Sequence, residues 1–361
     1  MKKLYEKNNC LVNVSSSLLR HYGLAYHHKS LASLDRIFDK TDKKLCVVLL
    51  DGFGSAIRNR YRKEAKRINS HYYRRITSVF PPTTVAATTS LLTDCFPMES
   101  GWLGWTEQFP EYERAVTMFA SQFAQEPEED TPVKVTDLLP VRTILSAMEK
   151  KGLRVSDVRS FALKEPKTVS FFEETNRRIK ESDFVYAYCC EPDSSLHRYG
   201  VGGKEIPSLI EELDERMGKL ADENLDTLFL VLADHGHLNA VNYNIDSHPD
   251  FFSLLRIPHY AGEGRAAFFY VKPGKEEEFR TLARRYYGKD FYILSKEEVL
   301  ENKIFGVGIP SPRFEGLLGD FLLISKGEAV FLQAQETPKM ISHHAGSSDD
   351  EIYIDISVFN G

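Results

Sequence analysis

Carboxylates follow three apolar runs of the sequence. Asp51 comes after Leu45–Leu50, Asp193 after Phe184–Cys189, and Asp234 after Leu228–Ala233. Runs of this length, bounded by polar segments, are typical of buried strands in a mainly parallel sheet. Ligands of such sheets bind beyond the carboxyl ends of the strands, so the three acids should meet there. Carboxylates gathered at one place repel one another unless a cation neutralises them, and the pattern therefore predicts a metal site.

Histidines at short spacings supply further ligands. His197 follows Asp193 by four residues, so both can bind one ion from a single loop or helical turn. His235 is adjacent to Asp234, and His344 comes much later in the chain. Mixed Asp and His ligands suit Zn²⁺, and Mn²⁺ less specifically.

A hydroxyl-rich segment adds a candidate nucleophile. Phe80–Thr93 contains two prolines followed by threonines and small residues, which is typical of a loop entering a helix. Thr83 is a suitable helix N-cap. The N–H groups at a helix N-terminus bind phosphate, and a bound Zn²⁺ can lower the pKa of a threonine hydroxyl there.

The elements that position these residues alternate between strand and helix. Five apolar residues between Ile206 and Leu220 recur every three or four positions, which predicts a helix with one buried face. A second predicted helix, 144–151, ends at Gly152 before another strand near 153–155. The sequence therefore predicts an α/β fold with a mainly parallel central sheet flanked by helices.

The pattern changes between residues 249 and 338. Two strands, 267–271 and 291–294, flank a charged helix at 275–285, and 321–325 with 329–333 is expected to form a hairpin turning near Gly327. We predict a small inserted α+β subdomain at 249–338. The catalytic core is then formed by 1–248 and 339–361.

Composition limits the partners and the location. The net charge of -6 disfavours a nucleic-acid polymer as partner, because affinity for phosphate backbones comes from clustered Lys and Arg. No apolar run approaches the roughly 20 residues that cross a bilayer. The apolar stretch of a secretory signal is missing and the five cysteines form no CxxC pair, so the cytoplasm is the expected location. Nothing in the sequence indicates the oligomeric state.

Taken together, the motifs resemble the alkaline phosphatase superfamily, and its type I phosphodiesterase/nucleotide pyrophosphatase branch in particular. They appear in the order of that family and extend from Asp51 to Glu351, over most of the chain. They comprise Asp-Gly at 51–52, Pro-Thr-Thr at 82–84, Ser-Leu-Leu-Thr at 90–93, Asp-Ser-Ser-Leu-His at 193–197, Ala-Asp-His-Gly-His at 233–237 and the late His344.

The resemblance implies roles for individual residues. The family places its nucleophilic Thr six residues before the Ser of this Ser-Leu-x-Thr segment, which selects Thr84 over Thr83. Two divalent ions, Zn²⁺ or alternatively Mn²⁺, are implied. The residues expected around one ion are Asp51, Thr84, Asp234 and His235, and those around the other are Asp193, His197 and His344.

The implied reaction is phosphodiester or nucleotide pyrophosphate hydrolysis of a small substrate through a phospho-threonine intermediate. Two departures weaken the case for a nucleotide: Ala87 stands where eukaryotic-type members have Asn, and Ser100 where the family has His. A phosphomonoesterase and a phosphonate hydrolase of the same superfamily remain alternatives. A catalytically silent metal-dependent binding protein is the alternative of another class.

Three further residues keep two interpretations each. His237 is either a residue that orients a metal ligand or a buried polar residue whose hydrogen bonds are satisfied. Trp102 and Trp105, the two tryptophans, follow the nucleophile helix and either pack in the interior or stack on substrate.

Overall fold

The computed structural model describes residues 3–165 and 167–361. Its central sheet has six strands, of which β9, β1, β8 and β7 are parallel neighbours. One strand, β18, runs antiparallel to both of its neighbours. In spatial order the strands are β2 (Tyr72–Thr77), β18 (Tyr353–Phe359), β9 (Thr227–Leu232), β1 (Lys44–Leu50), β8 (Phe184–Cys189) and β7 (Val155–Arg159). The predicted α/β fold with a mainly parallel sheet is confirmed.

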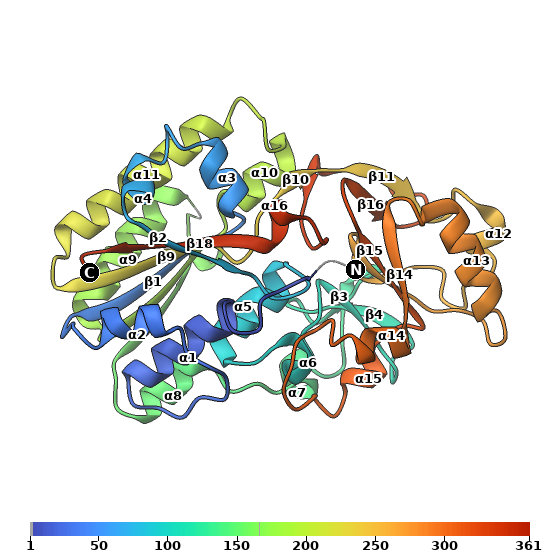
Figure 1. The fold of residues 1–361 in the computed structure, drawn as a ribbon, viewed down its shortest axis with the longest axis horizontal. Coiled ribbons are helices and arrows are strands. Elements are labelled where there is room, and N and C mark those ends of the chain that lie inside the picture. Colours follow the sequence, from blue (N-terminus) through green and yellow to red (C-terminus); the bar gives the residue numbers. More distant parts are fainter. Residues whose placement is uncertain (1–2, 166) are drawn as a thin grey trace.

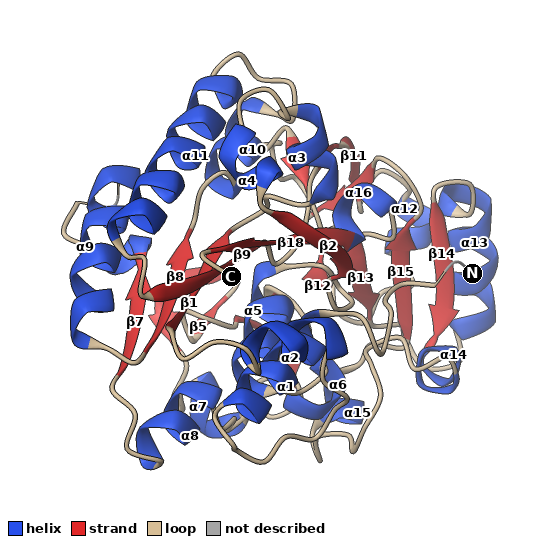
Figure 2. Cartoon of the chain, turned by 60° about the vertical axis from the view of Figure 1, so that its left-hand side comes forward, coloured by secondary structure: helices blue, strands red, loops and turns tan. Residues whose placement is uncertain are grey.

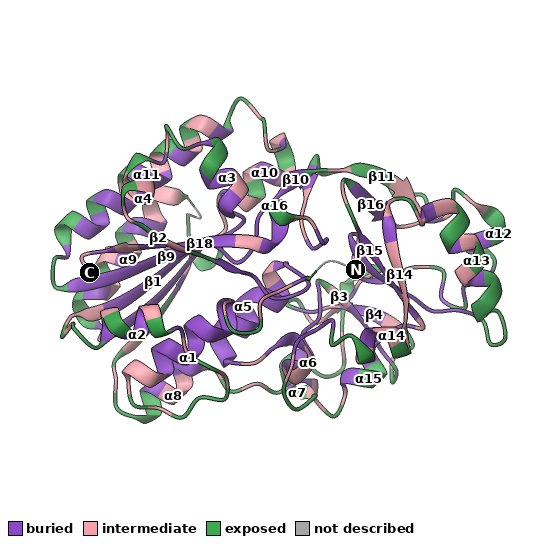
Figure 3. Ribbon diagram, in the orientation of Figure 1, coloured by how far each residue is buried: buried purple, intermediate pink, exposed green. Residues whose placement is uncertain are grey.

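Helices cover both faces of this sheet. Figure 1 shows α11 and α4 on one side and α1, α2 and α8 on the other. Strands β1, β8 and β9 are buried almost throughout, and the helices expose their outer faces (Figure 3). The helices of this part are α1 (Leu11–His21), α2 (Ala32–Phe38), α3 (Ser55–Arg60), α4 (Lys66–Ser70), α5 (Thr84–Thr93), α6 (Pro97–Ser100), α7 (Val135–Leu138), α8 (Ile144–Lys150), α9 (Thr168–Glu181), α10 (Asp193–Tyr199), α11 (Ile206–Glu223) and α16 (Asp349–Ile352).

A second sheet of eight strands lies beside the first; Figure 2 shows β7, β1 and β8 on the left and β13, β15 and β14 on the right. In spatial order its strands are β14 (Phe291–Ser295), β15 (Phe321–Ser325), β13 (Ala266–Phe269), β12 (Ala261–Glu263), β3 (Thr106–Phe109), β4 (Arg114–Thr117), β5 (Gln122–Phe123) and β6 (Glu126–Asp130). The accompanying helices are α12 (Pro249–Phe252), α13 (Glu276–Tyr287), α14 (Lys296–Glu301) and α15 (Phe314–Leu317).

This second sheet draws strands from two distant parts of the chain. Four of them, β3 to β6, come from 106–130, and Gly262 of β12 pairs with Thr106 of β3. The predicted subdomain limits of 249–338 include only the other four strands. The division into domains stays a prediction.

The expected hairpin at 321–333 is wrong. Strand β15 pairs with β13 and β14, whereas β16 (Ala329–Leu332) pairs in parallel with β11 (Val241–Asn244). Both sides of β15 are therefore occupied, and β16 continues into a separate two-stranded sheet. Another two-stranded sheet joins β10 (Leu238–Asn239) to β17 (Ser342–His343).

None of the helices in the described ranges has the length and hydrophobicity that a bilayer crossing requires.

Candidate metal centre

Three acids lie where the strands of the central sheet end. Asp51 follows the last residue of β1, Asp234 comes two residues after β9, and Asp193 is the first residue of α10 after β8. Two hydrogen bonds from backbone N–H groups connect the ends of these strands. The Asp193 N–H donates to the Asp51 carbonyl, and the Gly52 N–H donates to Asp234 Oδ1 at 3.1 Å. The parallel register thus brings together carboxylates far apart in sequence.

Thr84 begins α5 and faces one group of ligands. Its Oγ1 lies 3.2 Å from His235 Nε2 and 3.5 Å from Asp51 Oδ2. The same His235 nitrogen lies 3.2 Å from Asp51 Oδ1 and 3.6 Å from Asp234 Oδ2. The four residues expected around one ion therefore converge.

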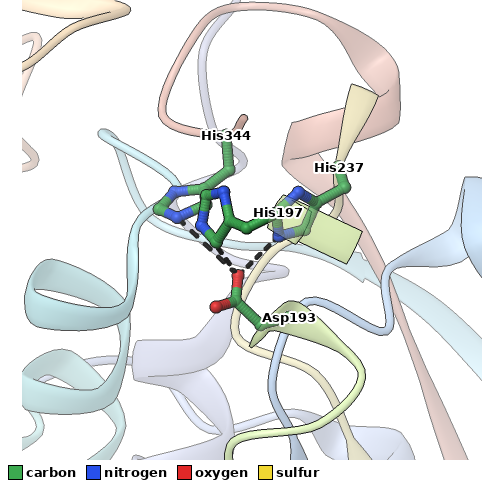
Figure 4. A group of neighbouring side chains, drawn as sticks. All are labelled: Asp193, His197, His237 and His344. Carbon is green, nitrogen blue, oxygen red and sulfur yellow. Dashed lines mark hydrogen bonds and ion pairs between the residues drawn. The ribbon is translucent and has the colours of Figure 1, made fainter. Parts of the chain in front are cut away.

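A second group surrounds Asp193 (Figure 4). His197, one helical turn along α10, places Nε2 3.4 Å from Asp193 Oδ1, and His344 places Nε2 3.8 Å from the same oxygen. His237 approaches closer than either, at 2.5 Å. Figure 4 shows the three imidazoles directed at one carboxylate oxygen. The donor atoms of these four residues all lie within 4.8 Å of one another.

The two groups adjoin each other. The rings of His235 and His344, one from each group, stack with centroids 3.8 Å apart. Donor atoms of Asp51, Asp193 and His235 also fall within 4.8 Å of one another. Two cations held by the two groups would be near neighbours.

Hydrogen bonds fix which ring nitrogen faces the acids. Nδ1 of His197 and Nδ1 of His235 each lie within 3.2 Å of a backbone carbonyl, those of Ser342 and Gly236 respectively. A carbonyl only accepts, so Nδ1 carries the proton in both rings and Nε2 keeps its lone pair. A lone pair directed at carboxylates is favourable only with a cation or a proton between them.

Buried polar atoms without a partner support the same conclusion. Among the described residues, Asp51 Oδ1, Asp234 Oδ2 and His344 Nδ1 are buried and accept or donate no hydrogen bond. Such atoms are costly to leave unpaired. Two of the three are carboxylate oxygens of the expected ligand set, and the Asp and His donors suit a divalent transition metal. The residues present therefore fit metal ions.

Electrostatics explain why the acids need cations. Burial, and then the neighbouring Asp193, raises the pKa of Asp51 well above its usual range; burial and Asp51 do the same for Asp234. Burial alone would also raise the pKa of Asp193, but His197 and His237 hold it below its usual value. Burial, then His235, lowers the pKa of His344. Cations would favour ionised acids and neutral imidazoles throughout.

Three residues of the site were missed or left open by the sequence. His237 contacts Asp193 directly. It lies two residues after His235, so both histidines can face the same site, and this spacing was the signal in the sequence. The Tyr188 hydroxyl donates to Asp51 Oδ2 from inside the apolar β8, where no sequence signal marked it. Glu263 of β12 accepts a bond from Thr83 Oγ1 at 2.6 Å, a contact across 180 positions. Thr83 occupies the predicted N-cap position, but its side chain makes this bond instead of capping the helix.

Two cavities meet at the centre. One, of about 480 Å³, has aromatic walls that include Trp105, Phe119 and Phe161, with Arg159 as its one basic residue among the described lining. The other, of about 490 Å³, is lined by Glu263, Tyr260 and Phe331 together with His197 and His344. Both cavities share Thr84, Trp105, Asp193 and Ser194. The predicted nucleophile therefore stands at the junction of two spaces.

The two tryptophans have different environments. Trp102 is buried and its Nε1 donates to the Leu139 carbonyl, so it packs in the interior. Trp105 is 49% exposed and borders both cavities. Only Trp105 is thus available to contact a ligand.

Comparisons with known proteins agree with this geometry. A family model described as type I phosphodiesterase/nucleotide pyrophosphatase matches residues 154–348, more than half of the chain. No curated protein sequence matches significantly.

Similar solved structures include murine ectonucleotide pyrophosphatase/phosphodiesterase 5, with a TM-score of 0.66, 17% identity, and 87% of this chain and 88% of that chain covered. Phosphonoacetate hydrolase from Sinorhizobium meliloti, in complex with phosphonoformate, has a TM-score of 0.63 at 17% identity, with 88% and 90% covered. An inactive threonine-to-alanine variant of the murine protein, in complex with AMP, has a TM-score of 0.65 at 16% identity and covers 88% of each chain. At these identities the likeness concerns the fold.

Proposed function

Because the chain belongs to the type I phosphodiesterase/nucleotide pyrophosphatase family, and is thus a metal-dependent phosphoester hydrolase, we propose that it cleaves phosphodiesters with Thr84 as the nucleophile. The observation that carries this proposal is the position of Thr84. Its hydroxyl faces His235 and Asp51, and the residue lines both cavities. A phosphorus atom in front of it has a space for each of two ester substituents.

The residues proposed to hold one ion are Asp51, Thr84, Asp234 and His235, and those proposed for the other are Asp193, His197 and His344. Zn²⁺ is the proposed metal, because imidazole and carboxylate ligands suit it. Two bound cations would lower the pKa of the Thr84 hydroxyl and neutralise charge on the phosphoryl oxygens.

The chain itself contributes position and hydrogen bonds. Thr84 is the first residue of α5, so the N–H groups of the first turn, which have no partner within the helix, would be available to a phosphoryl oxygen bound there. In the proposed first step the Thr84 hydroxyl loses its proton to solvent, the Thr84 Oγ–P bond forms, and the bond from phosphorus to the leaving oxygen breaks; the leaving oxygen takes up a proton from solvent. In the second step water attacks phosphorus and loses a proton to solvent, the Thr84 Oγ–P bond breaks, and Oγ takes up a proton.

The cavity with aromatic walls suggests the kind of leaving group. Trp105, Phe119 and Phe161 are each about half exposed, and such faces bind planar rings. A nucleobase is a ring of this type, and the structure of the murine relative with AMP supports a nucleotide. We therefore propose nucleotide-containing diesters as the first substrates to test. The cytoplasmic location stays a prediction that cell fractionation would test.

The test compares bis-p-nitrophenyl phosphate, p-nitrophenyl phosphate and phosphonoacetate, before and after loading with Zn²⁺ or Mn²⁺, with elemental analysis of the purified protein. We expect diester turnover to exceed monoester turnover. A preference for the monoester or for phosphonoacetate would instead support the corresponding alternative, and metal binding without any turnover would support the silent binding protein.

Thr84→Ala tests the nucleophile, and Thr83→Ala is its matched control. Thr84→Ala should lower kcat at least 10³-fold, as expected for loss of a covalent nucleophile. Thr83→Ala removes a hydroxyl from the adjacent position and should lower kcat by roughly tenfold or less. Equal effects of both substitutions would contradict the assignment of Thr84.

A further inference from the structure

Glu263 directs a carboxyl group from the second sheet at the loop before the nucleophile. It is the last residue of β12, and its Oε1 accepts hydrogen bonds from Thr83 Oγ1 at 2.6 Å and from the Trp105 N–H at 2.8 Å. Thr83 immediately precedes Thr84. Glu263 also lines the cavity that contains His197 and His344. The carboxyl group therefore stands beside the place where a phosphoryl group must lie.

Among the described residues that line this cavity, no Arg or Lys is free to neutralise Glu263. The cavity has one Arg or Lys among its described lining residues, Arg265, and this guanidinium is already committed. Its Nε and Nη2 bind the Glu351 carboxylate at 2.7 and 2.8 Å, and Nη1 and Nη2 donate to the carbonyls of Ala329 and Gly327. A second acid, Glu336, lines the same cavity. Burial raises the pKa of Glu263 to about 7, so the carboxyl group is mostly ionised above that pH.

We propose that Glu263 is a specificity-determining residue that favours phosphodiesters over phosphomonoesters. This inference rests on the proposed function. A monoester dianion carries a negative oxygen where a diester carries an uncharged ester group. The ionised Glu263 repels that extra charge, whereas a diester can extend its second substituent into the cavity beside Glu263. Repulsion between like charges several ångströms apart is strong in a partly buried site.

The experiment compares Glu263→Gln with the wild type, both loaded with Zn²⁺, at pH 8.5, where Glu263 is ionised. An amide oxygen still accepts the bonds from Thr83 and Trp105, so the loop keeps its partners while the charge is removed. We measure kcat/KM for p-nitrophenyl phosphate and bis-p-nitrophenyl phosphate, and the inhibition constant of inorganic phosphate. The monoester-to-diester ratio of kcat/KM should rise on the order of tenfold, and phosphate should inhibit more strongly.

Glu336→Gln is the matched control, because it removes the same charge from the same cavity without a contact to Thr83. It should leave the ratio within roughly twofold of wild type, since this exposed carboxylate is screened by solvent. Glu263→Asp retains the charge and should retain the preference for diesters.

Three results would overturn the inference. One is an unchanged monoester-to-diester ratio of kcat/KM in Glu263→Gln with activity retained. Another is an equal loss of activity of Glu263→Gln toward both substrates, which indicates a structural role. The third is a rise of this ratio in Glu336→Gln as large as that in Glu263→Gln. A wild type that turns over neither ester would instead overturn the proposed function itself.

Discussion

Ser342 shows how single residues orient the candidate centre. Its hydroxyl donates to the Leu196 carbonyl at 2.6 Å, so its oxygen must accept the bond from His237 Nδ1 at 3.1 Å. Its backbone carbonyl accepts from His197 Nδ1 at 2.7 Å. One residue thus sets the protonated nitrogen of two rings, and both rings direct Nε2 at Asp193. Partners of this kind fix the tautomer of a metal-binding histidine.

A histidine outside the centre makes stability depend on pH. Burial lowers the pKa of His259 to about 4, and its Nε2 lies 3.3 Å from Gln108 Oε1. The unfolded chain takes up a proton near pH 6.5, which the folded protein binds only near pH 4. The contribution of His259 to stability therefore falls as pH decreases from about 6.5 to about 4, and this residue has no further effect below that.

Urea unfolding of the metal-free protein at pH 7.5 and pH 4.5 measures this effect. His259→Gln should lose less stability between the two values than the wild type, because glutamine does not titrate. Equal losses in both proteins would contradict the prediction.

At the scale of elements, the turn after β9 is packed against the backbone of α16. The Gly236 N–H donates to the Glu351 carbonyl at 2.9 Å, and a methyl group on Gly236 would collide with the carbonyl oxygen of Asp350. His235 and His237 flank this glycine. The close approach of these two backbone segments therefore fixes the backbone positions of His235 and His237.

Gly236→Ala should destabilise the protein by about 1–3 kcal/mol, because an overpacked backbone contact must shift. It should also weaken Zn²⁺ binding, since both flanking histidines move with the turn. Thermal unfolding with and without Zn²⁺, together with a competition titration of Zn²⁺, measures the two effects. Gly327→Ala is the control, as nothing lies within 4 Å of its added methyl group. Unchanged Zn²⁺ affinity in Gly236→Ala would contradict this account.

The elements that the sequence predicted well are those with one dominant signal. Strands β1, β8 and β9 are continuous apolar runs, and α11 repeats its buried residues at helical spacing. Strand β6, Glu-Pro-Glu-Glu-Asp, is exposed throughout and has no such signal. The hairpin failed because strand pairing in the second sheet depends on β13 and β14, not on the short link between β15 and β16.

The residues of the candidate site also fall into those that the sequence could predict and those that it could not. Acids and histidines at strand ends could be recognised because the register of a parallel sheet brings those ends together. Glu263 and Tyr188 could not, because each contact depends on how a distant element packs against the centre.

At the scale of the whole molecule, one buried ion pair joins the second sheet to the centre. Arg265 lies between β12 and β13, and Glu351 belongs to α16; both side chains are fully buried. Glu351 also accepts the N–H groups of Gly346 and Ser348, next to His344. The ion pair therefore connects the second sheet to the loop that carries His344, a candidate metal ligand.

Arg265→Met should destabilise the protein by about 3–5 kcal/mol, because it leaves the Glu351 carboxylate buried without its partner. Arg265→Met combined with Glu351→Met should cost less than the sum of the single substitutions. Urea unfolding of the metal-free proteins completes this cycle. The exposed pair Lys275–Glu278 is the control, for which a coupling of about 0–1 kcal/mol is expected. Additive effects at Arg265 and Glu351 would contradict the prediction.

The pairing of Gly262 with Thr106 limits how substrate preference can be transplanted between relatives. A chimera that moved only residues 249–338 into a relative would pair β12 with a foreign strand in place of β3, and the position of Glu263 relative to the backbone N–H that Trp105 supplies here would change. A chimera that exchanged both 106–130 and 249–338 would keep the pairing between β3 and β12.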